Sequence, residues 1–276
     1  MVNYCRVELV YGAILLISCV NIGFVTSYSL VSTNNLMKEL EITFSQYAIF
    51  DVITYFTAIC GPYISYFVLL FTGRKIAILV FMIMNSIMWF ILPSLTKKVF
   101  IIGYIDRAFF GIIIGALSTL IPIYLIEISP PKMVGLFGST YQTAVFFGNV
   151  VCDLAGNYLD WKDVSYIGGG ISLLFLFMIW FLPDSPESKH HTQTIDNSNP
   201  QAPNKLSLAK SRNSIFHRDY IQQISICILL VFFQTSTGFF LFRENIPYVF
   251  KEVDLIFPEL MSYSISEMTL VIFSII

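Results

Sequence analysis

The sequence predicts an all-α membrane protein, and two observations carry this prediction. Of the 276 residues, 56% are hydrophobic and only 12% are charged, and the mean hydropathy is +0.72. Soluble domains carry about 25% charged residues, so this chain has too few to cover a surface that faces water. The second observation is a series of seven apolar runs of about 20 residues, the length that crosses a bilayer core of about 30 Å.

The seven runs are separated by short polar or turn-forming segments, as expected for consecutive membrane helices. They are Tyr11–Val31, Tyr47–Phe71, Ile76–Leu95, Val99–Ile126, Val134–Leu154, Val164–Leu182 and Ile221–Phe242. An eighth run begins near Ser266 and stops at Ile276. Because about eleven residues are too few to cross a bilayer, we expect the chain to be truncated at its C-terminus.

The longest polar stretch of the chain follows the sixth run and divides the predicted spans into two groups. It has the composition of a solvated linker, and it includes the adjacent His190 and His191. No Cys, His or carboxylate stands near these histidines at the spacing of metal ligands, so we expect no metal there. The predicted organisation is therefore a six-span bundle at 1–186, a linker at 187–218 and the start of a second bundle at 219–276.

Basic residues predict the orientation of the chain in the membrane. With the N-terminus inside the cell, nine Lys and Arg residues lie on the cytoplasmic side and six on the opposite side. Cytoplasmic loops carry an excess of basic residues, so we expect a multi-pass protein of the cell membrane with a cytoplasmic N-terminus and a cytoplasmic linker. The net charge of −2 gives no reason to expect nucleic acid as a partner.

A motif of nine residues extends from the fourth run into the fifth. An arginine is followed by glycines four and eight positions later, then by Pro-x-Tyr-x-x-Glu-x-x-Pro, a glycine and a glutamine within the membrane. These residues are Arg107, Gly111, Gly115, Pro122, Tyr124, Glu127, Pro130, Gly135 and Gln142. Gly73-Arg74-Lys75 follows the second run, and Pro183-Asp184-Ser185-Pro186 closes the sixth.

These motifs, in this order, resemble the sugar porters of the major facilitator superfamily, and the first run most resembles the insect facilitated trehalose and glucose transporters. The resemblance implies the six-helix N-terminal bundle of that superfamily and the start of its second bundle. It also implies facilitated diffusion of a hexose or trehalose by alternating access. Gln142, Gln234 and Thr26 are the implied sugar-binding residues. Arg107, Glu127 and Arg74 are the implied gating residues, with Arg74 a candidate ionic partner of Glu127.

Two of these residues are also costly in a membrane for general reasons. An arginine within a span costs about 2.5–3.5 kcal/mol on insertion scales, so Arg107 should face a partner or water, or else reach the outer interface with help from Asp106. An unpaired amide in hydrocarbon is costly as well, so we expect Gln142 to face the bundle interior. There it would bind sugar hydroxyls or hydrogen-bond a neighbouring helix.

Several positions depart from the pattern of the sugar porters. Proton-coupled relatives carry an aspartate in the first span where this chain has Val25, and this favours facilitated diffusion. Val134 replaces an arginine before Gly135, and Thr235 replaces a second glutamine after Gln234. Such losses leave the identity of the sugar open.

Other classes of protein fit the sequence less well. Seven runs and the pair Asp106-Arg107 suggest a seven-helix receptor, but that pair lies within a run. A non-transporting relative or a fragment remains an alternative, since polar residues of the pattern are missing. No nucleophile, base and orienting group recur at a recognisable spacing, so we expect neither an enzyme nor a cofactor. The predicted partners are a sugar and the lipid bilayer, and the sequence leaves the oligomeric state open.

Overall fold

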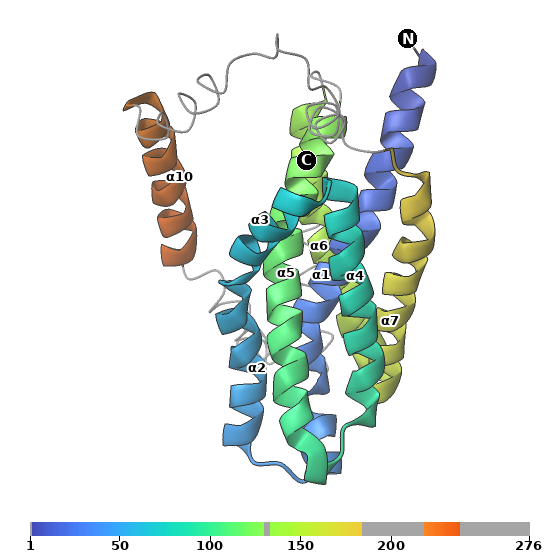
Figure 1. The fold of residues 1–276 in the computed structure, drawn as a ribbon. Coiled ribbons are helices and arrows are strands. Elements are labelled where there is room, and N and C mark those ends of the chain that lie inside the picture. The colour runs from blue at the N-terminus through green and yellow to red at the C-terminus, as the bar shows by residue number, and fades with distance from the viewer. Residues whose placement is uncertain (1, 130–132, 184–217, 238–276) are drawn as a thin grey trace, which may run out of the picture. The chain divides into compact units, whose positions relative to one another are not determined.

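A computed structural model describes residues 2–129, 133–183 and 218–237 of the chain (Figure 1). These residues belong to two compact units, and each is described by itself. The first unit contains α1 (Val2–Leu40), α2 (Phe44–Ala58), α3 (Gly61–Phe71), α4 (Arg74–Ile91), α5 (Phe100–Ile128), α6 (Val134–Tyr158) and α7 (Trp161–Met178). The second contains α10 (Arg218–Ser236). The described residues include no strand, which confirms the all-α prediction.

The predicted runs correspond closely to these helices. The first run lies on α1, the second on α2 and α3 together, and the third to sixth on α4, α5, α6 and α7 in turn. Turns of 3-10 helix extend α4 to Ser94 and α7 to Phe181. The seventh run begins on α10, and its last residues lie outside the described part. The eighth run and the predicted linker up to residue 217 lie outside it as well.

Four described helices are long and apolar enough to cross a membrane, or five if α2 and α3 count as one broken span. The four are the parts of α1, α4, α5 and α7 at Val10–Thr33, Arg74–Ser94, Lys97–Ile128 and Trp161–Phe181. Helix α6 is as long as a span, with 25 residues, but is not among these apolar helices.

The second predicted run differs from the expected single helix, because α2 and α3 meet at an angle of 45°. Gly61 begins α3 at the break, and Pro62 follows it in the first turn. A Cβ atom on Gly61 would stand 2.5 Å from the amide nitrogen of Ala116 on α5, so the two backbones touch. The break therefore lies where this span is in backbone contact with α5.

The glycines of the fourth run explain this close crossing. A Cβ on Gly111 would lie 2.1 Å from the carbonyl oxygen of Thr54, and one on Gly115 would lie 2.1 Å from that of Ala58. Small residues at this spacing let membrane helices approach each other. The tight helix packing expected from Gly111 and Gly115 is confirmed, and α5 continues through Pro122 to Ile128.

Helix α2 begins at a capping box that the sequence encodes as Thr-Phe-Ser-Gln. The backbone N–H of Gln46 donates to Thr43 Oγ1 at 3.4 Å, and the backbone N–H of Thr43 donates to Gln46 Oε1 at 3.0 Å. This reciprocal pair satisfies two of the N–H groups that a helix start leaves unpaired. It fixes the turn between α1 and α2.

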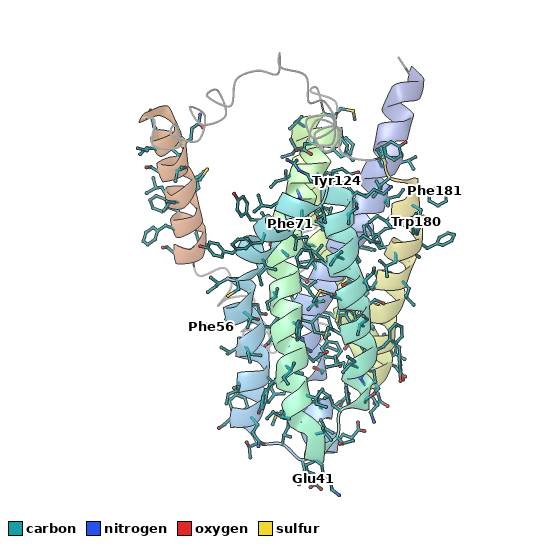
Figure 2. The ribbon with its side chains drawn as sticks, viewed as in Figure 1. Glu41, Phe56, Phe71, Tyr124, Trp180 and Phe181 are labelled. Atoms are coloured by element: carbon teal, nitrogen blue, oxygen red, sulfur yellow. The ribbon has the colours of Figure 1, made fainter. Side chains whose placement is uncertain are left out.

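The two ends of the first unit carry different polar groups. Tyr124 lies at one end and Glu41 at the other (Figure 2). We call the end with Tyr124 and Arg74 the Arg74 end, and the end with Glu39 and Glu41 the Glu39 end. At the Glu39 end, the Lys97 ammonium lies 2.6 Å from Glu41 Oε2 and ties the turn after α1 to the segment before α5.

At the same end, Glu39 of α1 accepts from two residues of the first turn of α7. The Trp161 indole N–H donates to Glu39 Oε2 at 2.5 Å, and Lys162 forms an ion pair with the other carboxylate oxygen. The hydrogen bond from Lys162, and then the one from Trp161, lower the pKa of Glu39 below its ordinary value. A lowered pKa in the folded state means that these contacts stabilise the fold when the carboxyl is ionised.

We predict a small loss of stability at acid pH from this contact. The contribution of Glu39 is complete above the ordinary glutamate pKa of about 4.3 and disappears as the pH falls through the lower folded-state pKa. Because the side chain is half exposed, solvent screening limits the contribution to about 1 kcal/mol or less. Thermal unfolding of the purified protein at pH 7 and pH 3 measures this contribution. In the Glu39→Gln variant, the difference in melting temperature between the two pH values should be smaller. An unchanged pH dependence in this variant would contradict the assignment.

Candidate functional site

The predicted sugar-binding amide, Gln142, lies on α6 and is exposed on the first unit. The expectation that it faces the interior of this bundle is wrong. Within the described residues, its side chain has no hydrogen-bond partner, so the helix-to-helix bond considered as its alternative is not formed there. An exposed amide in a membrane-spanning unit offers both donors and acceptors to whatever approaches that face.

A polar stripe follows Gln142 along α6. Asn149 and Asp153 stand seven and eleven positions later, which places all three within about 40° of one direction around the helix. Asn149 is 4% exposed and Asp153 is fully buried. The stripe of Gln142, Asn149 and Asp153 therefore runs about 16 Å along α6, from an exposed amide to a buried carboxyl.

Helix α1 covers the buried part of this stripe. The Thr26 hydroxyl donates to Asn149 Oδ1 at 3.0 Å, and the Ser27 hydroxyl donates to Asp153 Oδ1. Thr26 also donates to the Gly23 carbonyl oxygen of its own helix, at 2.8 Å. The structure thus brings the predicted Thr26 to the polar stripe of α6, next to Asn149.

Two glycines make this pairing of α1 and α6 possible. A Cβ on Gly23 would lie 1.9 Å from the Val145 carbonyl oxygen, and one on Gly148 would lie 2.0 Å from that of Val20. Both carbonyl oxygens belong to the backbone, which cannot rotate out of the way as a flexible side chain can. The two helices are therefore in backbone contact beside the polar stripe.

Arg107 is completely buried within α5. Its guanidinium carbon lies 4.5 Å from the ring centroid of Phe50, 4.7 Å from that of Tyr28 and 5.6 Å from that of Phe110. Cation–π contacts of this kind contribute about 2 kcal/mol when desolvated. Among the described residues, none accepts a hydrogen bond from the side-chain nitrogens. The alternative of an arginine that reaches the interface is therefore wrong.

The Arg74 end gathers three of the sequence motifs. Arg74 forms an ion pair with Glu127, and the two side chains are 20% and 22% exposed. Lys75 donates to the Leu182 carbonyl oxygen at 2.6 Å, and the Tyr124 hydroxyl donates to that of Pro183. The start of α4, the end of α5 and the chain after α7 are thus held together, and the candidate pairing of Arg74 with Glu127 is present.

We predict strong coupling between Arg74 and Glu127 in a double-mutant cycle. Each alanine variant should lower the free energy of unfolding, and the double variant should lose less than the sum, by about 0.5–3 kcal/mol. Thermal or denaturant unfolding in detergent measures the three variants. The reversed pair Arg74→Glu with Glu127→Arg is the matched control and should regain part of the loss. Simple additivity would show that this ion pair contributes nothing.

The remaining predicted residue, Gln234, belongs to α10 in the second unit. Its approach to Gln142 stays a prediction. Groups of three or more His, Cys, Asp or Glu side chains that could hold a metal ion are absent from the described residues.

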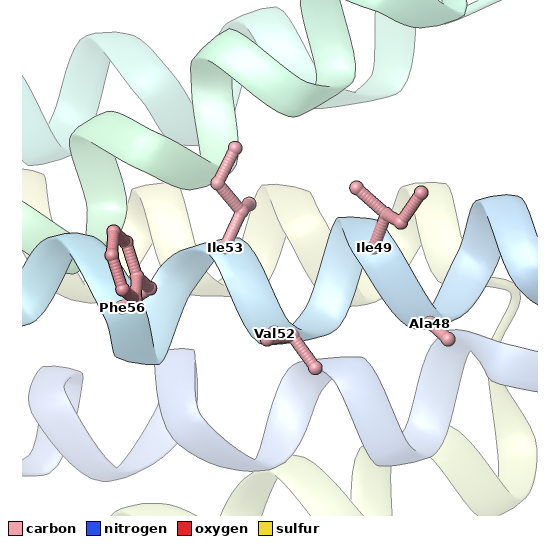
Figure 3. Close-up of a pocket in the computed structure, with 5 residues that line it drawn as sticks. All are labelled: Ala48, Ile49, Val52, Ile53 and Phe56. Carbon is pink, nitrogen blue, oxygen red and sulfur yellow. The ribbon is translucent and has the colours of Figure 1, made fainter.

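A pocket on α2 is chemically unsuited to sugar. It measures about 360 Å³ and is lined by Ala48, Ile49, Val52, Ile53 and Phe56 (Figure 3). These side chains offer no hydrogen-bond donor or acceptor, whereas a site for a polyhydroxylated ligand needs several. The polar stripe of α6 is the better candidate.

Sequence reasoning missed Asn149, Asp153 and Ser27. The signal was present, because a carboxyl and two amides share one face of a predicted membrane helix. The motif of the sugar porters ends at Gln142, seven residues before Asn149, and most of the fifth run is apolar.

Comparisons with known proteins point to one family. The family described as "Sugar (and other) transporter" matches residues 15–276. Sugar transporter ERD6-like 6 of Arabidopsis thaliana is 28% identical over 167 residues, which are 60% of this chain and 34% of that protein. Facilitated trehalose transporter Tret1 of Culex quinquefasciatus is 29% identical over 126 residues, 46% of this chain and 23% of that protein. The matches thus span about a third or less of these relatives.

Solved structures share the fold. The xylose transporter XylE from E. coli, in a partially occluded inward open conformation, superposes with a TM-score of 0.73 at 16% sequence identity. The superposition covers 97% of this chain and 69% of that one. The predicted fold class is confirmed.

Proposed function

Because the chain belongs to the sugar (and other) transporter family, we propose that it carries a sugar of the hexose or trehalose class across the cell membrane. The observation that carries this proposal is the polar stripe of α6, which presents the exposed Gln142 and, further along the same face, Asn149 bonded to Thr26. Amides and hydroxyls are the groups that match the hydroxyls of a sugar. The names of the relatives, which include sugar and trehalose transporters, support the same class.

The proposed mechanism is alternating access. In transporters built from two bundles, substrate sites lie near the bilayer midplane between them, and the bundles rock around the site. Gln142 would bind sugar from the first unit and Gln234 from α10. With the N-terminus in the cytoplasm, the Arg74 end is the inner end. There the ion pair of Arg74 and Glu127 would stabilise the conformation in which the inner side is closed. Arg107, the third proposed gating residue, would stabilise the packing of the outer half of the first unit.

Uptake of labelled glucose and labelled trehalose by cells that express this chain tests the proposal. We expect uptake that saturates with sugar concentration and exceeds that of cells with an empty vector. The amount of protein at the membrane is measured in parallel. Absence of uptake with normal membrane levels would favour a non-transporting relative, the alternative that the missing polar residues suggest.

A further inference from the structure

We propose that two polar clasps fix α1 on α7, and that the residues of α1 which form them, Asn21 and Tyr28, are positioning residues for the sugar site. This inference rests on the sugar-transport function proposed above. Asn21 is 1% exposed and Tyr28 is fully buried. Both side chains are bonded to α7, whereas Thr26, which lies between them on α1, is bonded to α6.

The Asn21 clasp joins three helices. Asn21 Nδ2 donates to the Gly168 carbonyl oxygen at 3.0 Å and to Ser172 Oγ at 2.8 Å. The Ser172 hydroxyl donates to the same carbonyl oxygen at 3.0 Å. Asn85 of α4 donates to Asn21 Oδ1 at 2.6 Å and to Ser172 Oγ at 2.8 Å. Both ends of the Asn21 amide are therefore bonded to other helices.

The Tyr28 clasp repeats this arrangement. The Tyr28 hydroxyl donates to the Trp161 carbonyl oxygen at 2.9 Å and lies 2.7 Å from Ser165 Oγ. The Ser165 hydroxyl donates to the same carbonyl oxygen at 2.8 Å. In each clasp, a polar group of α1 thus meets a carbonyl of α7 and the serine four positions later.

The two clasps have the same spacing on both helices. Seven positions separate residues 21 and 28 on α1, and seven separate residues 161 and 168 on α7. Seven residues make about two helical turns, or roughly 10 Å. Apolar contacts have no preferred direction, whereas a single buried asparagine can fix the register of two packed helices. A shift of α1 along α7 by one residue would break both clasps.

The segment of α1 between the clasps carries its contacts with the polar stripe. Gly23 is in backbone contact with Val145 of α6, and the Thr26 hydroxyl donates to Asn149 Oδ1 at 3.0 Å. A glycine contact lets the helices approach, but it has no side chain that could prevent sliding. We infer that the clasps, on the α7 side of α1, determine where Thr26 stands along the stripe.

The position of the clasps indicates which step of transport they affect. In the proposed mechanism the two bundles rock around the site, and both clasps lie inside the first bundle. They would therefore stay closed throughout the cycle and act on sugar binding alone. A loss of binding that is equal in all states raises KM and leaves the maximal rate unchanged.

The first test is uptake of labelled glucose and labelled trehalose by cells that express the full chain with Tyr28→Phe. This change removes the hydroxyl and keeps the ring that contacts Arg107. The bond from Ser165 to the Trp161 carbonyl remains, so the melting temperature should change little. We expect KM to rise by about 3- to 10-fold, the effect of about one hydrogen bond, at an unchanged maximal rate.

The Asn21 clasp needs a variant that separates positioning from stability. Asn21→Leu alone takes from Asn85 the oxygen to which it donates, so it should lower the melting temperature. Adding Asn85→Leu and Ser172→Ala removes the unpaired groups and should restore the melting temperature. KM should stay raised in this triple variant, because the clasp is still absent.

A double-mutant cycle tests whether the clasps act through Thr26. Thr26→Val removes the hydroxyl that bonds Asn149, and adding Tyr28→Phe to it should raise KM no further. Ser18→Ala is the matched control on α1. The Ser18 hydroxyl is buried and donates to the Leu15 carbonyl oxygen of its own helix at 2.6 Å, so this variant should transport as the unmodified protein does.

The outcomes separate this inference from the transport function. An unchanged KM in both Tyr28→Phe and the triple variant would overturn the inference and leave the transport function standing. A lower maximal rate at unchanged KM would overturn it as well, because the clasps would then open during the cycle. Additive effects of Tyr28→Phe and Thr26→Val would overturn the positioning role. Absence of sugar movement in every form of the protein would overturn the transport function, and this inference with it.

Discussion

Replacing Gln142 by alanine is expected to raise the sugar concentration needed for half-maximal uptake by about one to two orders of magnitude and to leave the amount of protein at the membrane unchanged. The side chain is exposed and has no hydrogen-bond partner among the described residues, so its removal costs the fold little. A sugar hydroxyl deprived of its partner in a closed site loses about 1–3 kcal/mol, or roughly 5- to 150-fold in affinity. Uptake of labelled glucose and trehalose measures the effect.

The neighbouring Thr143 provides the control for this experiment. Its hydroxyl donates to the Ser139 carbonyl oxygen of its own helix at 3.1 Å, so Thr143→Ala should transport normally. Undiminished uptake by Gln142→Ala would remove this residue from the site. A fall in membrane level would instead assign it a structural role.

Replacing Gly148 by alanine is expected to prevent the first unit from folding stably. The added methyl group would stand 2.0 Å from the Val20 carbonyl oxygen, so α1 and α6 would have to separate. Overpacking a well-packed interior costs about 1–3 kcal/mol, and more where backbone must move. We expect a large fall in the melting temperature and in the yield of monodisperse protein in detergent.

Gly138 offers a matched control on the same helix. A Cβ there would meet no atom within 4 Å. Alanine is better than glycine in a helix by about 1 kcal/mol, so Gly138→Ala should be neutral or stabilising. If Gly148→Ala were as stable as Gly138→Ala, the close contact between α1 and α6 would be refuted.

Much of the architecture could be predicted from the sequence, because apolar runs of span length have few alternatives to a membrane helix. The close packing of Gly111 and Gly115 followed from their spacing, and the pairing of Arg74 with Glu127 followed from the resemblance. The break between α2 and α3 could not be foreseen, since Gly61-Pro62 alone does not distinguish a bend from a continuous helix. It depends on how near the backbone of α5 comes.

The site was harder to predict than the fold. Whether an arginine is buried depends on side chains far away in the sequence, and the rings around Arg107 come from α1, α2 and α5. An amide in hydrocarbon is costly, and this predicts that Gln142 avoids contact with lipid. The argument does not specify whether the residue lies inside the first unit or on a surface that faces something other than lipid. Asp153 became significant only when its partner Ser27 was located on another helix.

The contacts of Lys75 and Tyr124 with the end of α7 have a mechanical consequence. Lys75 of α4 donates to the Leu182 carbonyl oxygen and Tyr124 of α5 donates to that of Pro183, so the segment just after α7 is anchored to two other helices. A pull on the chain beyond Pro183 would load α4, α5 and α7 together before it could unwind the last turn. Under tension, this anchor would protect the last turn of α7 from unwinding, as a strain relief protects the end of a cable.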